Sequence, residues 1–391
     1  MFQTFSTLVI AFFIGAIAIV HTQACIAQDP VEELSIDQLD NSNIRVATYN
    51  VSLYGSKAGE VAQRMADGKD KQAEKLAAVI QTVRPDILLL NEVDYDQAGT
   101  VANAFAEKFL AVPQGDRQPL DYPYVYSVPT NTGLRSGLDL DGNGKLTDPV
   151  DAWGFGMYEG QYALAVLSRY PIVTDEVRTF QKFLWRDFPN AKRPVHPTTG
   201  EPYFPDDIWE QLRLSSKNHV DVPIEVGDER IHLLASHPTP PVFDGPEDHN
   251  GCRNHDEIKF WEHYLSATDA DWIVDDQGKS GGLEKDAYFV IAGDLNSDPI
   301  EGDSQKDAMQ KLLAHSLVQD CKPRWLGQKD PAKTQTALFG RDRMMRIDYV
   351  IPSSQFRVVE SGVFWPKQFS PDNRLVDATD HRLVWVEVAI P

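Results

Sequence analysis

One stretch constrains the fold more than any other, residues 288–299, which read YFVIAGDLNSDP. Its first five residues form an uninterrupted apolar run, which is typical of a β-strand buried on both faces. Asp294 and Asn296 follow at alternate positions. Side chains two residues apart project from the same face of a strand, so this pair is expected to address one ligand. A strand followed by a simple turn explains the stretch alone equally well, because Gly, Asp, Asn and Pro are common turn residues.

The same pattern, an apolar run that ends in polar residues, recurs along the chain. A strand expected at 45–51 ends near Asn50, and a second strand at 86–90 is followed by Glu92. Apolar residues at helical spacing between them predict a helix at 69–83. Further strands are expected at 161–169, 230–237, 346–352 and 383–389, and further helices near 97–110, 257–265 and 304–317. This order of strands and helices indicates an α/β protein.

Composition and charge narrow the class of protein. The chain has 391 residues, of which 42% are hydrophobic and 24% charged, as in a soluble globular protein. Pro, Gly, Trp and Tyr are frequent in 111–160, 175–228 and 238–285, which are interpreted as long loops of one domain. The net charge of −21 and the lack of a basic run predict no strong nucleic-acid-binding surface. A nuclease is not excluded, because metal ions can bring phosphate to a carboxylate-rich site. We expect a monomer.

The N-terminus has the pattern of a targeting segment. Residues 8–20 are almost wholly apolar, but this run is too short for a comfortable membrane span. Small residues follow, and cleavage after Ala24 or Ala27 fits a secretory signal peptide, although no Lys or Arg precedes the apolar run. A retained anchor is the alternative, and lipidation at Cys25 has a poor sequence match.

The expected organisation is therefore a signal peptide at 1–27, a linker at 28–43 and a single domain at 44–391. We expect an exported protein with no membrane span after removal of the signal. Cys252 and Cys321 remain in the mature chain, and in an oxidising compartment they are able to pair only if they lie close together. The sequence leaves that pairing open.

A second acidic segment lies at 139–151, with the sequence DLDGNGKLTDPVD. The first half of a calcium-binding loop pattern is matched by Asp139, Asp141 and Asn143. The twelfth position is Val150, where the pattern requires Glu, although Asp148 or Asp151 is available as a substitute. The segment is either a structural Ca²⁺ site or a plain acidic turn.

Seven short motifs occur in one order along the chain. They are TYNV at 48–51, NE at 91–92, LSRYPI at 167–172, SH at 236–237, GDLNSDP at 293–299, RIDYV at 346–350 and TDH at 379–381. This ordered set resembles the endonuclease/exonuclease/phosphatase superfamily, which has the pancreatic-deoxyribonuclease-like fold. The resemblance implies an α/β (α+β) four-layer sandwich, in which two mixed β-sheets pack face to face and are flanked by helices.

The resemblance also implies a metal site. Glu92 would be the primary ligand, with Asn50 beside it and Asp380 as an additional carboxylate. Hard divalent cations prefer such oxygen ligands, so the implied cofactor is Mg²⁺, with Mn²⁺ as an alternative. In the family, the residue that matches Asp294 orients or deprotonates the attacking water.

Four further residues receive implied roles from the same resemblance. Asn296 would hydrogen-bond the phosphate, and His381 would contact the phosphate while Asp348 orients its imidazole. His237 matches a second histidine that binds phosphate or protonates the leaving group. Gln161 lies near a position where some members carry a carboxylate that supports this second histidine.

These expectations lead to one main hypothesis, an exported Mg²⁺-dependent phosphoesterase that acts by in-line attack of water on a phosphorylated substrate of unknown class. A secreted nuclease would normally add basic loops, and a sphingomyelinase-like phospholipase C would need an exposed apolar hairpin, for which 153–158 is the only candidate. A non-catalytic binding protein on the same fold would have lost metal-binding or proton-transfer residues, and none is lost.

Overall fold

A six-stranded mixed sheet is built around β1 (Ile44–Leu53). β1 pairs in parallel with β2 (Ile87–Val93), and every other pairing in this sheet is antiparallel. The order across the sheet is β12 (Arg357–Val363), β13 (Val384–Ala389), β1, β2, β4 (Ala163–Ser168) and β3 (Tyr124–Val128). The computed structural model from which these bounds come describes residues 43–266, 270–326, 330 and 332–391.

A five-stranded mixed sheet forms the second half of the fold. Its order is β11 (Asp348–Pro352), β8 (Tyr288–Asp294), β7 (Glu229–Ser236), β6 (His219–Val226) and β5 (Arg178–Thr179). β7 and β8 run in parallel, and the other neighbours are antiparallel. A separate hairpin consists of β9 (Ala337–Phe339) and β10 (Arg343–Met345).

The helices follow local sequence signals. α2 (Lys71–Val83) begins after Asp70, whose side chain accepts a hydrogen bond of 2.8 Å from the backbone N–H of Ala73, and ends at Arg84 in the left-handed conformation before Pro85. The other α-helices are α1 (Glu60–Met65), α3 (Thr100–Phe105), α4 (Asp206–Trp209), α5 (His249–Tyr264) and α6 (Asp307–Leu313). Shorter helical turns are η2 (Ala106–Leu110), η3 (Pro149–Asp151), η4 (Thr174–Glu176), η5 (Trp185–Asp187) and η6 (Pro371–Ala378).

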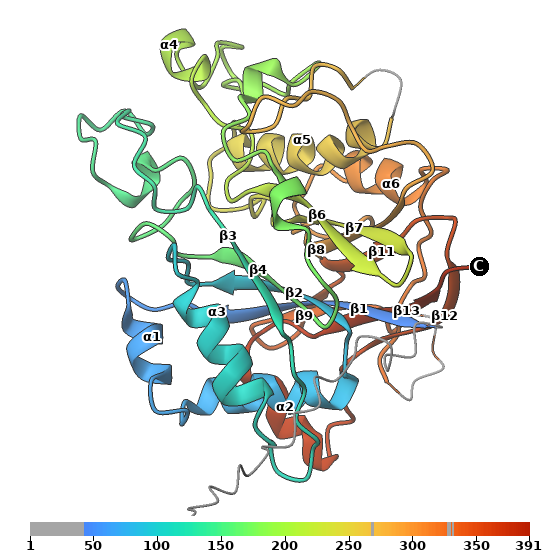
Figure 1. The fold of residues 1–391 in the computed structure, drawn as a ribbon. Helices are drawn as coiled ribbons and strands as arrows, with labels where there is room; N and C mark the ends of the chain where they lie inside the picture. The colour runs from blue at the N-terminus through green and yellow to red at the C-terminus, as the bar shows by residue number, and fades with distance from the viewer. Residues whose placement is uncertain (1–42, 267–269, 327–329, 331) are drawn as a thin grey trace, which may run out of the picture. The chain divides into compact units, whose positions relative to one another are not determined.

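Two apolar cores join these elements into four layers. One core lies between the six-stranded sheet and α2 and α3, and the other lies between the five-stranded sheet and α5 and α6. The inner faces of the two sheets pack on each other, with β1 and β2 against β8 and with β1 and β13 against β11. Figure 1 shows the two groups of helices on opposite outer sides of the paired sheets. The predicted four-layer α/β fold is confirmed.

The interpretation of three long segments as loops is wrong in part. The segment 111–160 contains β3, 175–228 contains β5 and β6, and α5 begins inside 238–285, eight residues before the helix expected there. Pro223 concealed β6, since proline is rare in central strands. β6 tolerates this proline because it pairs along its whole length with β7 but with β5 only at residues 220–221.

The expected signal peptide at 1–27, with Cys25, lies outside the described residues, as does the linker 28–43 apart from Asn43. All the described residues belong to one compact unit, Asp40–Pro391. Among them, no helix has the length and apolar character needed to cross a membrane. Cys252 and Cys321 are both free, so the structure contains no disulfide between them.

Candidate active site

The end of β8 is shaped by Gly293, which allows the strand to approach β7 closely. A Cβ atom on Gly293 would lie 1.9 Å from the backbone oxygen of Ser236, and the glycine has φ 151°. The chain then turns at Asn296, which has φ 52°. The carboxylate of Asp294 is thereby held at the strand end with 1% of the residue exposed.

Strand register brings the polar ends of both sheets together. Asp294 lies opposite Asp348 in the antiparallel pairing of β8 with β11. In β1, Tyr49 and Val51 pack toward the helices, so the alternate residue Asn50 faces the other sheet. Its amide Nδ2 donates a hydrogen bond of 3.1 Å to Oδ2 of Asp294, and this bond joins the two sheets at the site.

Asp294 lies between two histidines. Its Oδ2 atom is 3.5 Å from Nε2 of His237 and 3.7 Å from Nε2 of His381. Oδ1 accepts a hydrogen bond of 3.0 Å from the backbone N–H of Asn296. Burial raises the pKa of Asp294 to about 7, although the positive charge of His381 acts in the opposite direction.

His381 is held by Asp348. Its Nδ1 atom lies 3.1 Å and 3.0 Å from the two carboxylate oxygens of Asp348, which itself is buried. Burial alone lowers the pKa of His381, but the carboxylates of Asp348 and Asp294 outweigh it and raise the pKa to about 10. The ring is therefore an imidazolium at neutral pH, and its Nε2–H points toward Asp294.

His237 has the opposite character. The residue is 1% exposed, and neither ring nitrogen has a hydrogen-bond partner among the described residues. Burial lowers the pKa of His237 well below its usual value, and the nearby charges of Lys217 and His381 lower it further. The site therefore holds a neutral imidazole beside Asp294 and a charged one on its other side.

Glu92 and Asp380 lie at the solvent side of this cluster. Oε1 of Glu92 is 4.0 Å from Nε2 of His237, and its side chain is 21% exposed, while burial raises its pKa. Oδ1 of Asp380 is 3.8 Å from Nε2 of His381, and its side chain is 49% exposed. Neither carboxylate has a basic side chain within hydrogen-bonding distance among the described residues.

The donor set of the site fits a hard divalent cation. Carboxylates from Glu92, Asp294, Asp348 and Asp380 gather with the carboxamide of Asn50, and such oxygen donors are the ones that hard cations prefer. Ligand atoms of Asp294, Asp348 and His381 lie within 4.8 Å of one another. This geometric group differs from the expected ligands Asn50, Glu92 and Asp380, which lie around it.

The side chains of Asn296 and Gln161 both form hydrogen bonds to the backbone. Nδ2 of Asn296 donates a hydrogen bond of 3.0 Å to the backbone oxygen of Pro238, so this amide is fixed against the loop that follows β7. Gln161 does not support His237, and that expectation is wrong. Its side chain instead bonds the backbone oxygen of Gly55 at 2.9 Å and the backbone N–H of Met157 at 2.9 Å.

The second acidic segment brings three carboxylates together. Ligand oxygens of Asp139, Asp141 and Asp151 lie within 4.8 Å of one another. Nδ2 of Asn143 donates hydrogen bonds to the carboxylates of Asp141 at 2.8 Å and Asp148 at 3.0 Å. Asp151 thus takes the place left by Val150 in the loop pattern. Binding of Ca²⁺ here stays a prediction.

Sequence reasoning missed Lys217, a lysine that is only 5% exposed and lies two residues before β6. Its electrostatic neighbours include Glu92 and Asp294, so it lies beside the cluster. The sequence contained a signal for this strand, because polar and apolar residues alternate after Lys217 until the tight turn at Gly227. Recognising that run as the partner of β7 would have placed the lysine next to His237.

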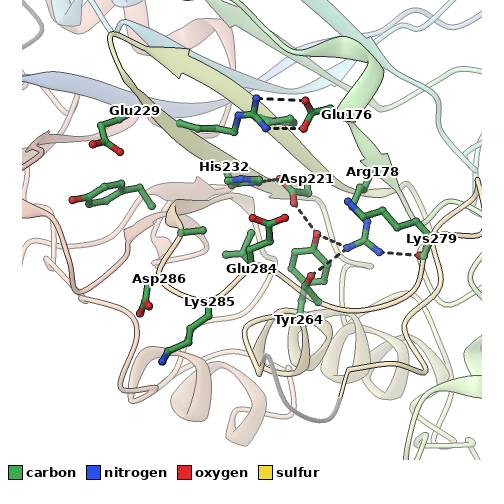
Figure 2. A pocket seen from close by; sticks show the side chains of 16 residues that line it. Glu176, Arg178, Asp221, Glu229, His232, Tyr264, Lys279, Glu284, Lys285 and Asp286 are labelled. Atoms are coloured by element: carbon green, nitrogen blue, oxygen red, sulfur yellow. Dashed lines mark hydrogen bonds and ion pairs between the residues drawn. The ribbon is translucent and has the colours of Figure 1, made fainter.

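A polar hollow of about 300 Å³ lies at the other end of the five-stranded sheet, at the starts of β7 and β8 (Figure 2). A hydrogen-bonded chain crosses it from Nδ1 of His232 to Asp221 at 2.7 Å, from Asp221 to the hydroxyl of Tyr264 at 2.7 Å, and from there to Arg178 at 3.2 Å. No residue of the expected site lines this hollow. These hydrogen bonds connect β6 and β7 to α5.

Comparison with known proteins agrees with this architecture. The model of the Endonuclease/Exonuclease/phosphatase family matches residues 47–381. None of the curated proteins matches the chain. Members of the family are hydrolases that act on phosphoesters, and they generally depend on divalent metal ions.

Several solved structures are similar to this chain. An endonuclease/exonuclease/phosphatase from Beutenbergia cavernae has 19% identity over 89% of this chain and 72% of that chain, with a TM-score of 0.48. An endonuclease/exonuclease/phosphatase family protein from Leptotrichia buccalis has 14% identity over 88% and 99%, with a TM-score of 0.48. Sphingomyelinase C from Streptomyces griseocarneus has 16% identity over 89% and 99%, with a TM-score of 0.46. The family match, which spans most of the chain, shows that this protein belongs to the endonuclease/exonuclease/phosphatase family.

Proposed function

We propose that the protein is an exported, divalent-cation-dependent phosphoesterase that hydrolyses its substrate by in-line attack of an activated water. One observation carries this proposal. The buried carboxylate of Asp294 lies within 3.7 Å of the Nε2 atoms of both His237 and His381. A carboxylate between a neutral and a charged imidazole can take up a proton while positive charge is available for a phosphate.

Asp294 is the proposed general base. A base works best when its pKa lies near the operating pH, and burial raises the pKa of Asp294 to about 7. The hydrogen bonds from Asn50 and from the backbone N–H of Asn296 fix the orientation of its two oxygens. The proton leaves the attacking water for Asp294 as the new oxygen–phosphorus bond forms, while the phosphorus–oxygen bond to the leaving group breaks and the leaving-group oxygen takes up a proton, for which the N–H of neutral His237 is the proposed donor.

The two histidines contact the phosphate with different charges, His381 as an imidazolium and His237 as a neutral imidazole. The imidazolium of His381 stabilises negative charge on the phosphoryl oxygens, and Asp348 keeps its ring oriented. The neutral ring of His237 offers unpartnered nitrogens to the phosphate or to the leaving-group oxygen. Asn296 is proposed as a further hydrogen-bond donor to the phosphate.

Glu92, Asn50 and Asp380 would hold the cation, which we propose is Mg²⁺, with Mn²⁺ able to replace it. When bound, the cation neutralises charge on the phosphate and polarises the phosphoryl oxygen. The substrate is proposed to be a phosphorylated compound other than a tightly bound nucleic acid, because the chain has a net charge of −21. Export, a single catalytic domain at 44–391 and a monomeric state complete the proposal.

An activity panel with and without EDTA tests this function. It contains bis-p-nitrophenyl phosphate, p-nitrophenyl phosphate, linear and circular DNA, sphingomyelin and inositol phosphates. We expect at least one substrate to be hydrolysed, with the activity abolished by EDTA and restored by Mg²⁺. Activity that persists in EDTA would contradict the metal dependence, and no hydrolysis with either Mg²⁺ or Mn²⁺ would contradict a phosphoesterase with these substrates.

A further inference from the structure

Lys217 lies at the same edge of the five-stranded sheet as the proposed catalytic residues. The pairing of β6 with β7 places His219 opposite Ser236, so the residues just beyond this pair leave the sheet at the same edge. The parallel pairing of β7 with β8 and the antiparallel pairing of β8 with β11 extend that edge. His237 follows β7 at this edge, Asp294 ends β8 and Asp348 begins β11, while Lys217 lies two residues before β6 at the same edge.

The backbone around Lys217 is fixed from several directions. Its own carbonyl oxygen accepts a hydrogen bond of 2.9 Å from the backbone N–H of Asn131. The preceding residue, Ser216, donates its backbone N–H to Oε1 of Glu257 at 2.7 Å. Gly154 packs so closely that a Cβ there would lie 1.8 Å from the Ser216 oxygen. The backbone position of this lysine is therefore determined by the fold.

The ammonium of Lys217 lacks a direct partner in the part of the chain that the structure describes. The residue is 5% exposed, yet no hydrogen bond or ion pair joins its Nζ atom to any described residue. Glu257 is its first electrostatic neighbour, but both oxygens of that carboxylate already accept backbone N–H groups, from Ser216 and Thr239. Buried charges are normally paired, because an unpaired one loses its hydration without compensation. Burial lowers the pKa of Lys217, while the carboxylates of Glu257, Glu92 and Asp294 favour its charged form. An anion that enters the site would supply the partner that this group lacks.

We propose that Lys217 binds a phosphoryl oxygen of the substrate from the side of His237. This inference rests on the proposed function and adds a catalytic residue to it. Lys217 would then add a second positive group to that of His381, and both lie near Asp294. Two positive groups compensate the carboxylates of the site, which would otherwise repel an anionic substrate.

A purely structural role would leave Lys217 as a distant counter-charge to Glu257. The two roles differ in what happens when an anion binds. A phosphate-binding lysine changes the affinity for phosphate, whereas a counter-charge changes the stability of the fold. Binding and stability must therefore be measured on the same variants.

The test is isothermal titration of the full chain with inorganic phosphate in buffer that contains Mg²⁺. We expect Lys217→Met to weaken phosphate binding by about 10- to 100-fold, as loss of a charged hydrogen bond would. Lys217→Arg should restore most of the affinity. The exposed Lys285→Met, in the hollow at the other end of the sheet, should bind phosphate like the wild type.

Folded Lys217→Met with unchanged phosphate affinity would overturn the proposal. If Lys217→Met and Lys217→Gln both fail to fold, the lysine serves as a structural counter-charge, and the proposal is again overturned. Phosphate binding needs no turnover, so it is measurable even if no substrate in the activity panel is hydrolysed. Failure of the proposed activity and failure of the Lys217 assignment are thus seen in different experiments.

Discussion

At the scale of single residues, the two histidines that face Asp294 differ in charge because their surroundings differ. His381 has the carboxylate of Asp348 at 3.0 Å, and this pair raises its pKa to about 10 against the effect of burial. His237 has no such partner and has Lys217 nearby, so its pKa is lowered. Two residues of the same type thus have pKa values shifted in opposite directions within one site.

The pKa of His381 predicts a pH dependence of stability. Its folded-state pKa of about 10 is above the ordinary value of 6.5, so the pair with Asp348 stabilises the fold fully below pH 6.5. That stabilisation is lost as the pH rises through the folded-state pKa. In EDTA, the melting temperature of the wild type should fall between pH 7 and pH 10 more steeply than that of His381→Gln. Equal slopes in circular-dichroism melts would contradict the charge assignment.

The sequence was sufficient to find most of the residues that meet at the site. Asp294, His381 and Asp348 each belong to a short motif at a strand end. The order of these motifs along the chain was what made them recognisable. Lys217 belongs to no such motif, and it is placed only by the pairing of β6 with β7. The role expected for Gln161 failed because side-chain direction at the start of β4 is not fixed by sequence spacing.

At the scale of elements, the site depends on how closely β7 and β8 approach. Gly293 makes this approach possible, and it directly precedes Asp294. Asn296 then turns the chain in the left-handed region, where Asn is tolerated better than most residues. The turn residues of this stretch therefore position the carboxylate of Asp294.

Gly293→Ala should lower both stability and activity. The added Cβ would lie 1.9 Å from the Ser236 oxygen, so the strands must separate beside His237 and Asp294. A displacement on the order of 1 Å can reduce activity by about 10²-fold. Gly278→Ala is the matched control, because its φ of 89° is also unfavourable for alanine but no atom lies within 4 Å. Equal activity of the two variants per folded molecule would contradict this role of Gly293.

The loop at 139–151 carries its own prediction. Asp139, Asp141 and Asp151 offer oxygen atoms within 4.8 Å of one another, so Ca²⁺ should raise the melting temperature of the wild type. The increase should disappear in Asp141→Ala and persist in Asp116→Ala, which removes a fully exposed carboxylate elsewhere. A melting temperature that Ca²⁺ leaves unchanged would identify the segment as a plain acidic turn.

Element prediction failed where a strand lacked its usual composition. β6 contains Pro223, and β12 contains a glycine and a glutamate with much of its surface exposed. Such strands are specified by their neighbours in the sheet, which a single sequence window does not contain. The buried strands β2 and β8 were found because their apolar runs are continuous.

At the scale of the whole molecule, the site forms only where the two sheets meet. Asn50 and Glu92 come from the six-stranded sheet, and His237, Asp294 and Asp348 come from the five-stranded sheet. Each sheet has its own apolar core with its own helices. The ordered motifs predicted this arrangement, whereas the long loops that would select a substrate do not follow from any motif.

Stability and activity should separate at the far end of the five-stranded sheet. Arg178 and Asp275 form an ion pair of 2.8 Å with side chains only 7% and 3% exposed. Asp275→Ala leaves this arginine buried without its counter-charge, so urea denaturation should show a loss of about 3–5 kcal/mol. Asp303→Ala breaks an exposed pair with Arg343 and should cost about 1 kcal/mol or less. Activity per folded molecule should stay at the wild-type level in both variants, and similar small losses of stability would contradict the prediction.

We propose that Asp294 activates the attacking water. This role is tested by measuring the hydrolysis of bis-p-nitrophenyl phosphate by the Asp294→Asn variant in Mg²⁺. This substitution keeps the shape of the side chain and removes the base. We predict that kcat falls by about 10²- to 10⁴-fold while the melting temperature stays within a few degrees of the wild type or rises, because burial disfavours the Asp294 carboxylate. Asp303→Asn, at an exposed carboxylate, is the control and should retain wild-type activity. A folded Asp294→Asn protein that hydrolyses the substrate within about twofold of the wild-type rate would contradict the claim.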